Sequence, residues 1–423
     1  MSAQELKPSS SPPERPDWLP PRKTSQSVEI TDFHAETGET VAEVPLLPDI
    51  PDTSGRVPIS WHRPFSAVAW VIRSGFAILS LILLLAVIAA IPIVNFVALG
   101  YLLEVEGRVA RSGRFRDAFP LLEIAPRLGA IVLGVWLWLI SLRLFSAAAA
   151  DARLIDPAGR AAVILSRLTV IAAFAIAIHL LLALARGGKF WCFFRPIKNL
   201  RSFVSRVRAG TFWSEAEQNV RDFVRRMQLR HHFWLGLRGY AGAFVWLLIP
   251  TALLAVADKT EPGPLIVSVV GGLSLIAVFS WLPFLQARFA TENRFRAFFE
   301  LKSVRQRIAR APLAWLIAVI AVYVLALPLY LFKVVAPPRD ALWFITPVFI
   351  MSIYPAKVLV GWAYHRGERK QRPASWIFRW GARVAIIPLL AAYVVLLFLT
   401  PTISQHGKLV LFEHHAFLLP VPF

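Results

Sequence analysis

The chain has 423 residues, of which 57% are hydrophobic, and its mean hydropathy is +0.57. Because the apolar residues come in blocks of about twenty, this composition excludes an ordinary water-soluble domain and indicates an integral membrane protein. The net charge is +20, but we do not expect nucleic acid as a partner, since the basic residues lie beside the apolar blocks. The single cysteine, Cys192, excludes an intramolecular disulfide and an all-cysteine zinc site.

The first 60 residues differ from the rest of the chain. They contain ten prolines and carry ten acidic side chains against five basic ones. Such a segment buries too little apolar surface to offset its ordering entropy, so we predict a disordered, acidic, Pro-rich tail over 1–60. It lacks the apolar core of a signal peptide. A linear motif around residues 41–50 would make the tail a contact for a protein partner, whereas the simpler interpretation is a solvated segment.

Eight near-continuous apolar blocks are each long enough to cross a hydrocarbon core of about 30 Å as a helix. We therefore predict an all-α, polytopic transmembrane helical bundle over 61–402, followed by a short C-terminal segment at 403–423. The predicted spans are 75–92, 128–150, 161–185, 239–257, 264–287, 313–335, 341–363 and 381–402.

The basic residues are concentrated in alternate linkers. Four linkers hold 29 Lys and Arg residues, at 104–127, 186–238, 288–312 and 364–380, whereas the linkers between them, at 151–160, 258–263 and 336–340, hold four. Lys and Arg near the ends of spans favour the cytoplasmic side. We therefore expect a multi-pass protein of the cell (inner) membrane with its basic loops in the cytoplasm.

The first apolar block, 75–103, is too long for one upright span. Pro92 removes a backbone donor and favours a break, and a helix over 93–103 would be only about 16 Å long. We predict a full span at 75–92, followed by a short helix that dips in and returns to the cytoplasmic side. The alternative is a single tilted span with the tail outside.

Two segments 180 positions apart in the sequence align without a gap. Arg114-Phe115-Arg116 and Arg294-Phe295-Arg296 each lead, through the same pattern of Phe, Leu and Arg, into a long apolar run. Four predicted spans separate the two copies, so both have the same orientation. The sequence therefore predicts a parallel internal repeat.

The basic linkers contain amphipathic helices. Apolar residues at helical spacing, many of them aromatic, alternate with cations over 197–207, 214–230 and 288–310. Such helices lie in the headgroup plane of a membrane, so we expect anionic lipids as partners. The alternative is that the apolar stripes pack on the spans as a lid. The arginines predicted to contact lipid headgroups or a partner are Arg201, Arg206, Arg208, Arg221, Arg225, Arg226, Arg294, Arg296, Arg305 and Arg307.

Polar residues in or beside the spans are the default functional candidates in a membrane protein. We single out Asn95, Glu104 and Arg143 as intramembrane polar candidates, which could together form a coupling-ion site. The simpler interpretation of each is local: Arg143 extends to the outer interface, and Glu104 pairs with Arg108 one helical turn away. Lys357 is expected to extend towards the cytoplasmic interface.

Glu106 has no obvious partner in the sequence.

The known enzymatic signatures are missing, since the chain has no P-loop, His-Glu-x-x-His or Gly-x-Ser-x-Gly motif. We therefore expect no catalytic residues, no metal and no cofactor. The cluster of His406, Glu413, His414 and His415 could hold a metal ion, but adjacent histidines point apart, and we interpret it as accidental.

Two runs of residues indicate a family. The first is Ile91-Pro92-Ile93, Leu99-Gly100-Tyr101-Leu102-Leu103, Arg108 and Gly113; the second runs from Ala290 to Pro312. Together they resemble the prokaryotic multi-pass membrane proteins of domain of unknown function 4013, over roughly 75–335. The long basic insert at 186–238, the additional C-terminal spans and the Pro-rich tail depart from that pattern. The resemblance implies a membrane architecture and no particular activity.

Two functions from different classes follow. The first is a non-enzymatic membrane scaffold whose interfacial helices engage anionic lipid or a partner protein. The alternative is a transporter or permease component, which the duplication and the broken first block favour. An intramembrane enzyme is a third possibility, but the sequence offers no nucleophile or metal ligands for it.

Overall fold

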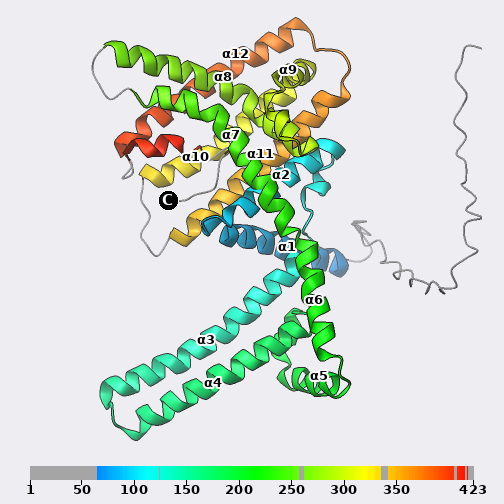
Figure 1. Ribbon diagram of the computed structural model, residues 1–423, viewed down its shortest axis with the longest axis vertical. Coiled ribbons are helices and arrows are strands. Elements are labelled where there is room, and N and C mark those ends of the chain that lie inside the picture. Colours follow the sequence, from blue (N-terminus) through cyan, green and yellow to red (C-terminus); the bar gives the residue numbers. More distant parts are fainter. Residues whose placement is uncertain are drawn as a thin grey trace, which may run out of the picture. The chain divides into compact units, whose positions relative to one another are not determined.

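The computed structural model describes residues 64–122, 124–256, 262–334, 342–403, 407–414 and 417. The chain divides into two units, 1–59 and 60–423, and the described residues all belong to the second. The predicted disordered tail at 1–60 thus lies outside them. The described part consists of helices and turns without a β-strand (Figure 1). Its elements are α1 (Pro64–Ala90), α2 (Asn95–Ser112), η1 (Phe115–Ala118), α3 (Ala125–Ile155), α4 (Arg160–Ala185), η2 (Phe190–Phe194), α5 (Pro196–Arg208), α6 (Phe212–Met227), α7 (Leu229–Leu254), α8 (Pro262–Glu292), η3 (Phe295–Phe299), α9 (Leu301–Arg310), α10 (Pro312–Val334), α11 (Leu342–Arg369), α12 (Trp376–Ile403) and η5 (Gly407–Phe412), where η denotes a 3-10 helix.

Eight stretches of the described residues are long and apolar enough to cross a membrane as helices. Each predicted span overlaps one of them, so the all-α, multi-pass architecture is confirmed. Several of these helices contain a proline, which bundles tolerate because neighbouring groups satisfy the freed backbone. The stretches are Val71–Ala90, Ala125–Ile155, Arg160–Ala185, Phe212–Leu254, Pro262–Glu292, Pro312–Tyr330, Phe344–Arg369 and Trp376–Thr402.

The first apolar block breaks where Pro92 predicts. α1 ends at Ala90, and Ile93 has a positive φ of 69° in the turn before α2. The predicted helix over 93–103 is too short, however, because α2 continues to Ser112 and buries most of its residues. The charged side chains after Leu103 end the apolar block in the sequence, but in the structure neighbouring helices partner them. α2 is therefore about 27 Å long, close to the thickness of a hydrocarbon core.

Small residues let α2 approach three neighbouring helices at backbone distance. A Cβ atom at Gly100 would lie 1.7 Å from a carbonyl oxygen of α7, and one at Gly107 would lie 2.5 Å from the Ala290 carbonyl oxygen of α8. A Cβ atom at Gly361 of α11 would lie 2.5 Å from a carbonyl oxygen of α2. Such close contacts are how helices associate inside membranes. They make α2 a central helix of the bundle.

Turns with a shared backbone geometry follow α2, α4 and α8, although after α4 two further residues, Arg186 and Gly187 (φ 107°), come before the shared part. It begins with a residue in the left-handed conformation, which glycine and asparagine adopt most readily. An extended basic residue comes next, and a phenylalanine then opens a 3-10 helix: η1, η2 or η3. The turn found in both predicted repeat copies thus occurs a third time, at η2. The left-handed residues are Gly113 (φ 70°), Gly188 (φ 63°) and Asn293 (φ 53°), and the basic residues are Arg114, Lys189 and Arg294.

The three turns also share a hydrogen-bond acceptor. The carbonyl oxygen five positions after the left-handed residue accepts a bond from an aromatic side chain, and the residue carrying it is buried. A buried carbonyl without a partner would cost free energy, so this bond helps to fix the turn. The donors are Tyr354 Oη to Ala118 (2.7 Å), Trp138 Nε1 to Phe193 (2.9 Å) and Trp246 Nε1 to Phe298 (3.0 Å).

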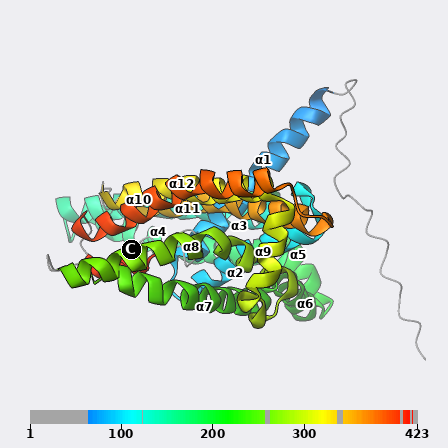
Figure 2. The ribbon, with the colours of Figure 1, turned by 90° about the horizontal axis from the view of Figure 1, so that it is seen from above.

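The repeated turns lie at one end of the bundle. Figure 2 shows α5, α6 and α9, which follow these turns, grouped at that end. We call it the basic end, because it carries the Arg-rich linkers. α3 and α4 pair with each other and extend from it, and their joined tips expose Leu154 and Ile155.

The chain after α12 returns to the bundle core. η5 lies against α12 and α7, and Val410, Leu411, His414 and Phe417 are buried. The described part of the predicted C-terminal segment at 403–423 is therefore packed between helices.

Candidate functional site

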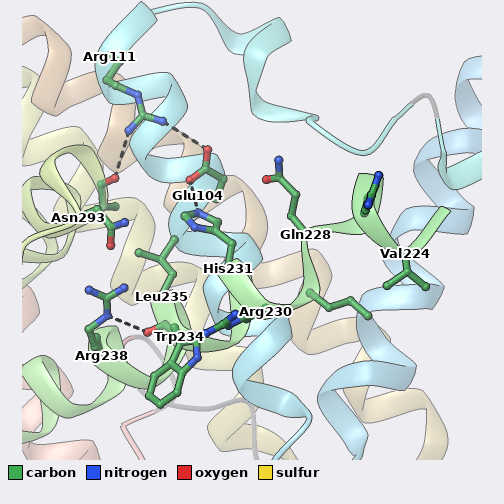
Figure 3. A pocket seen from close by; sticks show the side chains of 13 residues that line it. Glu104, Arg111, Val224, Gln228, Arg230, His231, Trp234, Leu235, Arg238 and Asn293 are labelled. Carbon is green, nitrogen blue, oxygen red and sulfur yellow. Dashed lines mark hydrogen bonds and ion pairs between the residues drawn. The ribbon is translucent and has the colours of Figure 1, made fainter. Parts of the chain in front are cut away.

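A pocket of about 960 Å³ opens at the basic end, where α2 and α8 end and α7 begins (Figure 3). Basic and apolar side chains line most of it, and Glu104 is its acidic lining residue. This combination suits a ligand that is anionic at one end and apolar at the other. We call it the basic pocket; its arginines are Arg111, Arg225, Arg230 and Arg238, His231 lies beside them, and its apolar residues include Val224, Leu229, Trp234 and Leu235.

Glu104 organises one wall of the basic pocket. Its Oε1 accepts a bond from Arg108 Nε at 2.8 Å, which confirms the predicted pair, and lies 3.4 Å from Arg111 Nη2. Its Oε2 lies 3.4 Å from His231 Nε2 of α7. Burial alone would raise the pKa of Glu104, but the bond from Arg108 and the charges of both arginines outweigh it, so the pKa is lowered. The carboxylate therefore stays ionised and links α2 to α7.

Arg111 is engaged by the protein itself. Its Nη1 donates to the carbonyl oxygens of Ala290 and Thr291, both at 3.2 Å, and so ties the end of α2 to the end of α8. Arg225 and Arg230 are exposed, as Arg111 is, but no ion pair or side-chain hydrogen bond within the described residues engages them. These two side chains are the ones placed to receive an anionic ligand.

The arginines predicted to contact headgroups lie on α5, α6, η3 and α9 and in the residue before η3, at the basic end. Most are exposed: Arg201, Arg208, Arg221, Arg225, Arg226, Arg294, Arg296 and Arg305. Arg206 is half-buried and pairs with Glu215 at 3.1 Å. Arg307 is also half-buried, between Glu368 at 3.0 Å and the ring of Tyr364 at 4.9 Å. The structure thus places Arg225 at the basic pocket and gives Arg307 a role in joining α9 to α11.

Two arrangements were predicted for the amphipathic helices, one packed on the spans as a lid and one in the headgroup plane, and different helices fit each of them. α9 buries its apolar residues Val304 and Ile308 against the bundle, as a lid would. On α5 and α6 much of the apolar stripe stays exposed, at Ile197, Leu200, Val204, Val207, Val220 and Val224. An apolar face with no protein over it beside a row of exposed arginines is typical of a helix in the headgroup plane.

A second polar site lies inside the bundle. Lys357 of α11 is buried, and its Nζ lies 3.0 Å from Glu106 Oε2 of α2 and donates to Gln286 Oε1 of α8 at 2.6 Å. Both partners are fully buried, and Glu106 Oε1 has no hydrogen-bond donor among the described residues. We call these three residues the buried charge cluster. The expectation that Lys357 extends to the interface is wrong, because Glu106 and Gln286 satisfy its ammonium group within the core.

The internal repeat carries a sequence signal for this cluster. Glu106 and Gln286 are 180 residues apart, the offset of the internal repeat. They therefore occupy the same place in two copies, and the pair could have been found by extending the alignment upstream of Arg114. Nothing in the sequence, however, identifies Lys357 as the residue between them.

The three intramembrane candidates do not meet. Asn95 and Glu104 lie nine residues apart on α2, which separates them by about 13 Å along the helix axis. Arg143 is exposed on α3. Asn95 is buried at the start of α2, and its Oδ1 has no hydrogen-bond partner among the described residues. A coupling-ion site built from this trio is therefore not supported.

Within the described residues no group of three His, Cys, Asp or Glu side chains could hold a metal ion. His414 is buried and bonded to the hydroxyl of Thr251 at 2.8 Å. His406 and His415 lie outside the described residues.

The comparisons with known proteins bear on the family. Residues 200–336 match the family model described as "Protein of unknown function (DUF4013)". The match includes the second of the two runs that carry the resemblance and part of the basic segment interpreted as an insert, whereas the run at 91–113 lies outside it. No curated protein and no solved structure matched the chain. Over residues 200–336 this multi-pass membrane protein is similar to the DUF4013 family, as its sequence motifs predict.

Proposed function

We propose that this chain is a non-enzymatic membrane protein that binds anionic, phosphate-bearing lipid headgroups at its basic pocket. In this proposal α5 and α6 lie in the headgroup plane beside the pocket. The observation that carries it is the exposure of both faces of these helices, apolar and cationic, whereas α9 buries its apolar stripe. A headgroup plane stabilises both faces at once.

The orientation follows from charge. The linkers at the basic end hold 29 Lys and Arg residues, and the alternate linkers hold four. We therefore place the basic end on the cytoplasmic side of the cell membrane, where anionic lipids create a negative surface potential.

The chemistry of the basic pocket fits a phospholipid. Arginine presents a planar fork of donors that matches phosphate geometry, and Arg225 and Arg230 are exposed there. Trp234 has both an apolar ring and a polar N–H, a combination favoured at membrane interfaces. Leu229 and Val224 supply the apolar wall that the first carbons of an acyl chain would contact.

Lipid-dependent thermal stability of the purified full-length protein tests this proposal. Short-chain phosphatidylglycerol should raise the melting temperature more than phosphatidylcholine does, and the R225Q/R230Q/R238Q variant should lose the difference. At about 1 kcal/mol per cation, affinity for the anionic lipid should fall roughly 100-fold. The control variant R143Q/R153Q/R160Q removes three exposed cations from α3 and α4, outside the pocket and outside the helices proposed to lie in the headgroup plane. Equal losses in both variants would show that binding is a diffuse charge effect, and the pocket would be rejected as a site.

A transporter or permease component is the second candidate, and the buried charge cluster favours it. Ionisable residues inside a membrane are costly and commonly mark ion or proton pathways. Liposomes containing the protein and a pH-sensitive dye should then show proton uptake that the E106Q variant lacks. Uptake no faster than that of empty liposomes would remove this candidate.

A further inference from the structure

The described C-terminal residues occupy the interior of the helical bundle. The ring of Phe417 stacks on Phe279 of α8, with ring centroids 5.9 Å apart and planes at 19°, and meets the edge of Tyr323 of α10 at 5.9 Å. The Phe417 side chain is fully buried. An aromatic group from after the last span is therefore enclosed by helices from the middle of the chain.

Polar contacts accompany these aromatic ones. Gln286 Nε2 of α8 donates to the Phe417 carbonyl oxygen at 3.0 Å, and the hydroxyl of Thr251 of α7 lies 2.8 Å from His414 Nε2. We call Thr251, Phe279, Gln286 and Tyr323 the seat. The seat recognises an aromatic ring together with a carbonyl group beside it.

The seat and the buried charge cluster share one residue, Gln286. Gln286 uses its Nε2 for the Phe417 carbonyl and its Oε1 for the ammonium group of Lys357, which in turn pairs with Glu106. If the C-terminal segment left the seat, the Gln286 amide would lose its acceptor beside a charged lysine. A carbonyl or carboxylate from another molecule could then take the same place.

A segment that only filled space in the core would not require polar groups beneath it, such as Gln286 and the ion pair of Lys357 and Glu106. Burying an ion pair costs desolvation free energy, and an apolar cluster of the same volume would hold a structural segment at least as well. The segment is also short, and part of it faces outward, because Leu409 of η5 is exposed. A segment that can leave the seat explains these features better than a permanent part of the core does.

We propose that the described C-terminal residues, 407–414 and 417, are a removable plug, and that the seat they fill is a binding site for an aromatic ligand bearing a carbonyl or carboxylate group. The plug excludes the ligand by presenting the same two chemical groups. This inference does not depend on lipid binding at the basic pocket, which involves other residues.

Cysteine accessibility in the full-length protein tests the proposal. Cys192→Ser removes the native thiol, and Thr251→Cys places a reporter where His414 covers it. A charged, water-soluble methanethiosulfonate should label this reporter slowly. Adding Phe417→Ala removes the ring stacking, so labelling should accelerate about tenfold. N-acetylphenylalanine should slow it again by competing for the seat, whereas N-acetylalanine should not.

Two control cysteines separate plug release from unfolding. Ser268→Cys is a buried position on α8, and the Ser268 hydroxyl donates to carbonyl oxygens at the end of α7, so its labelling should stay slow. Leu154→Cys is exposed and should be labelled rapidly in every variant. If Phe417→Ala also exposes Ser268→Cys, the milder Phe417→Leu variant is judged by the same criteria.

Unchanged labelling of Thr251→Cys in the plug variants would overturn the removable plug. Accelerated labelling that N-acetylphenylalanine does not slow would overturn the ligand site.

Discussion

Glu106 and Gln286 stand 180 positions apart in the sequence and meet at one atom, the Nζ of Lys357, at 3.0 and 2.6 Å. They are equivalent positions of two repeat copies, one in α2 and one in α8. One copy supplies a carboxylate and the other an amide, so a single lysine from α11 is neutralised on one side and hydrogen-bonded on the other. The duplication has thus produced a polar centre in which the two copies differ in charge.

Lys357→Met should strongly destabilise the protein. It would leave the Glu106 carboxylate buried without its cation, a change that costs about 3–5 kcal/mol in typical buried pairs. The double variant Glu106→Gln/Lys357→Met should recover much of this loss, because no charge remains. Thermal unfolding of the purified protein measures both, with the exposed Arg143→Met as the control. A single variant as stable as the wild type would contradict the buried pair.

Gly236→Ala should disrupt the contact between α2 and α7. The added Cβ atom would lie 1.9 Å from the Phe96 carbonyl oxygen, so the two helices would have to separate. Overpacking of this kind costs about 1–3 kcal/mol. Gly75→Ala and Gly381→Ala are matched controls in other helices, since a Cβ atom there meets nothing within 4 Å. Melting temperatures of the three variants should fall only for Gly236→Ala; equal effects would argue against the close crossing.

Trp246→Phe should weaken the repeated turn at η3. The variant keeps the aromatic volume but removes the N–H that donates to the Phe298 carbonyl at 3.0 Å, leaving a buried acceptor unpaired. The expected loss is about 1–3 kcal/mol of unfolding free energy. Trp213→Phe, at an exposed site on α6, is the control and should be close to neutral. Hydrogen exchange at residues 295–299 should increase in the first variant alone, and unchanged protection there would count against the shared acceptor.

Glu104→Gln should lower stability at neutral pH and much less in acid. The pKa of Glu104 is lowered in the folded protein, so ionisation stabilises the fold at pH values above the ordinary value of 4.5, and this stabilisation is lost as the pH falls through the folded pKa. The wild type and the variant should therefore differ by about 1–3 kcal/mol at pH 7. The difference should shrink as the pH falls below about 4.5. Melting curves from pH 3 to pH 8 measure it, and a difference independent of pH would exclude a role for the charge.

The membrane spans could be predicted from the sequence because each consists of a block of apolar residues. Lipid requires such a block in a helix that crosses the membrane. It was less informative at α2. Four charged residues after Leu103 ended the apolar block, although the helix continues to Ser112. Apolar blocks identify helices that face lipid, whereas α2 is surrounded by protein that pairs its charges.

The third copy of the repeated turn was also hidden. Gly188-Lys189-Phe190 shares a backbone conformation with Gly113-Arg114-Phe115, but the residues that follow differ. The shared features are a left-handed φ angle and a carbonyl acceptor, and neither has to leave a pattern of side chains in the sequence.

The sequence alone determined the membrane-spanning architecture, the concentration of Arg and Lys in alternate linkers and the amphipathic character of the helices at the basic end, since these depend on the local order of apolar and charged residues. Tertiary structure alone decided which charged residues of different helices meet. Lys357, Glu106 and Gln286 come from three helices, and Phe417 reaches Gln286 from beyond the last span. Such contacts depend on how helices distant in the sequence pack against one another, and that packing cannot be inferred from the local pattern of residues.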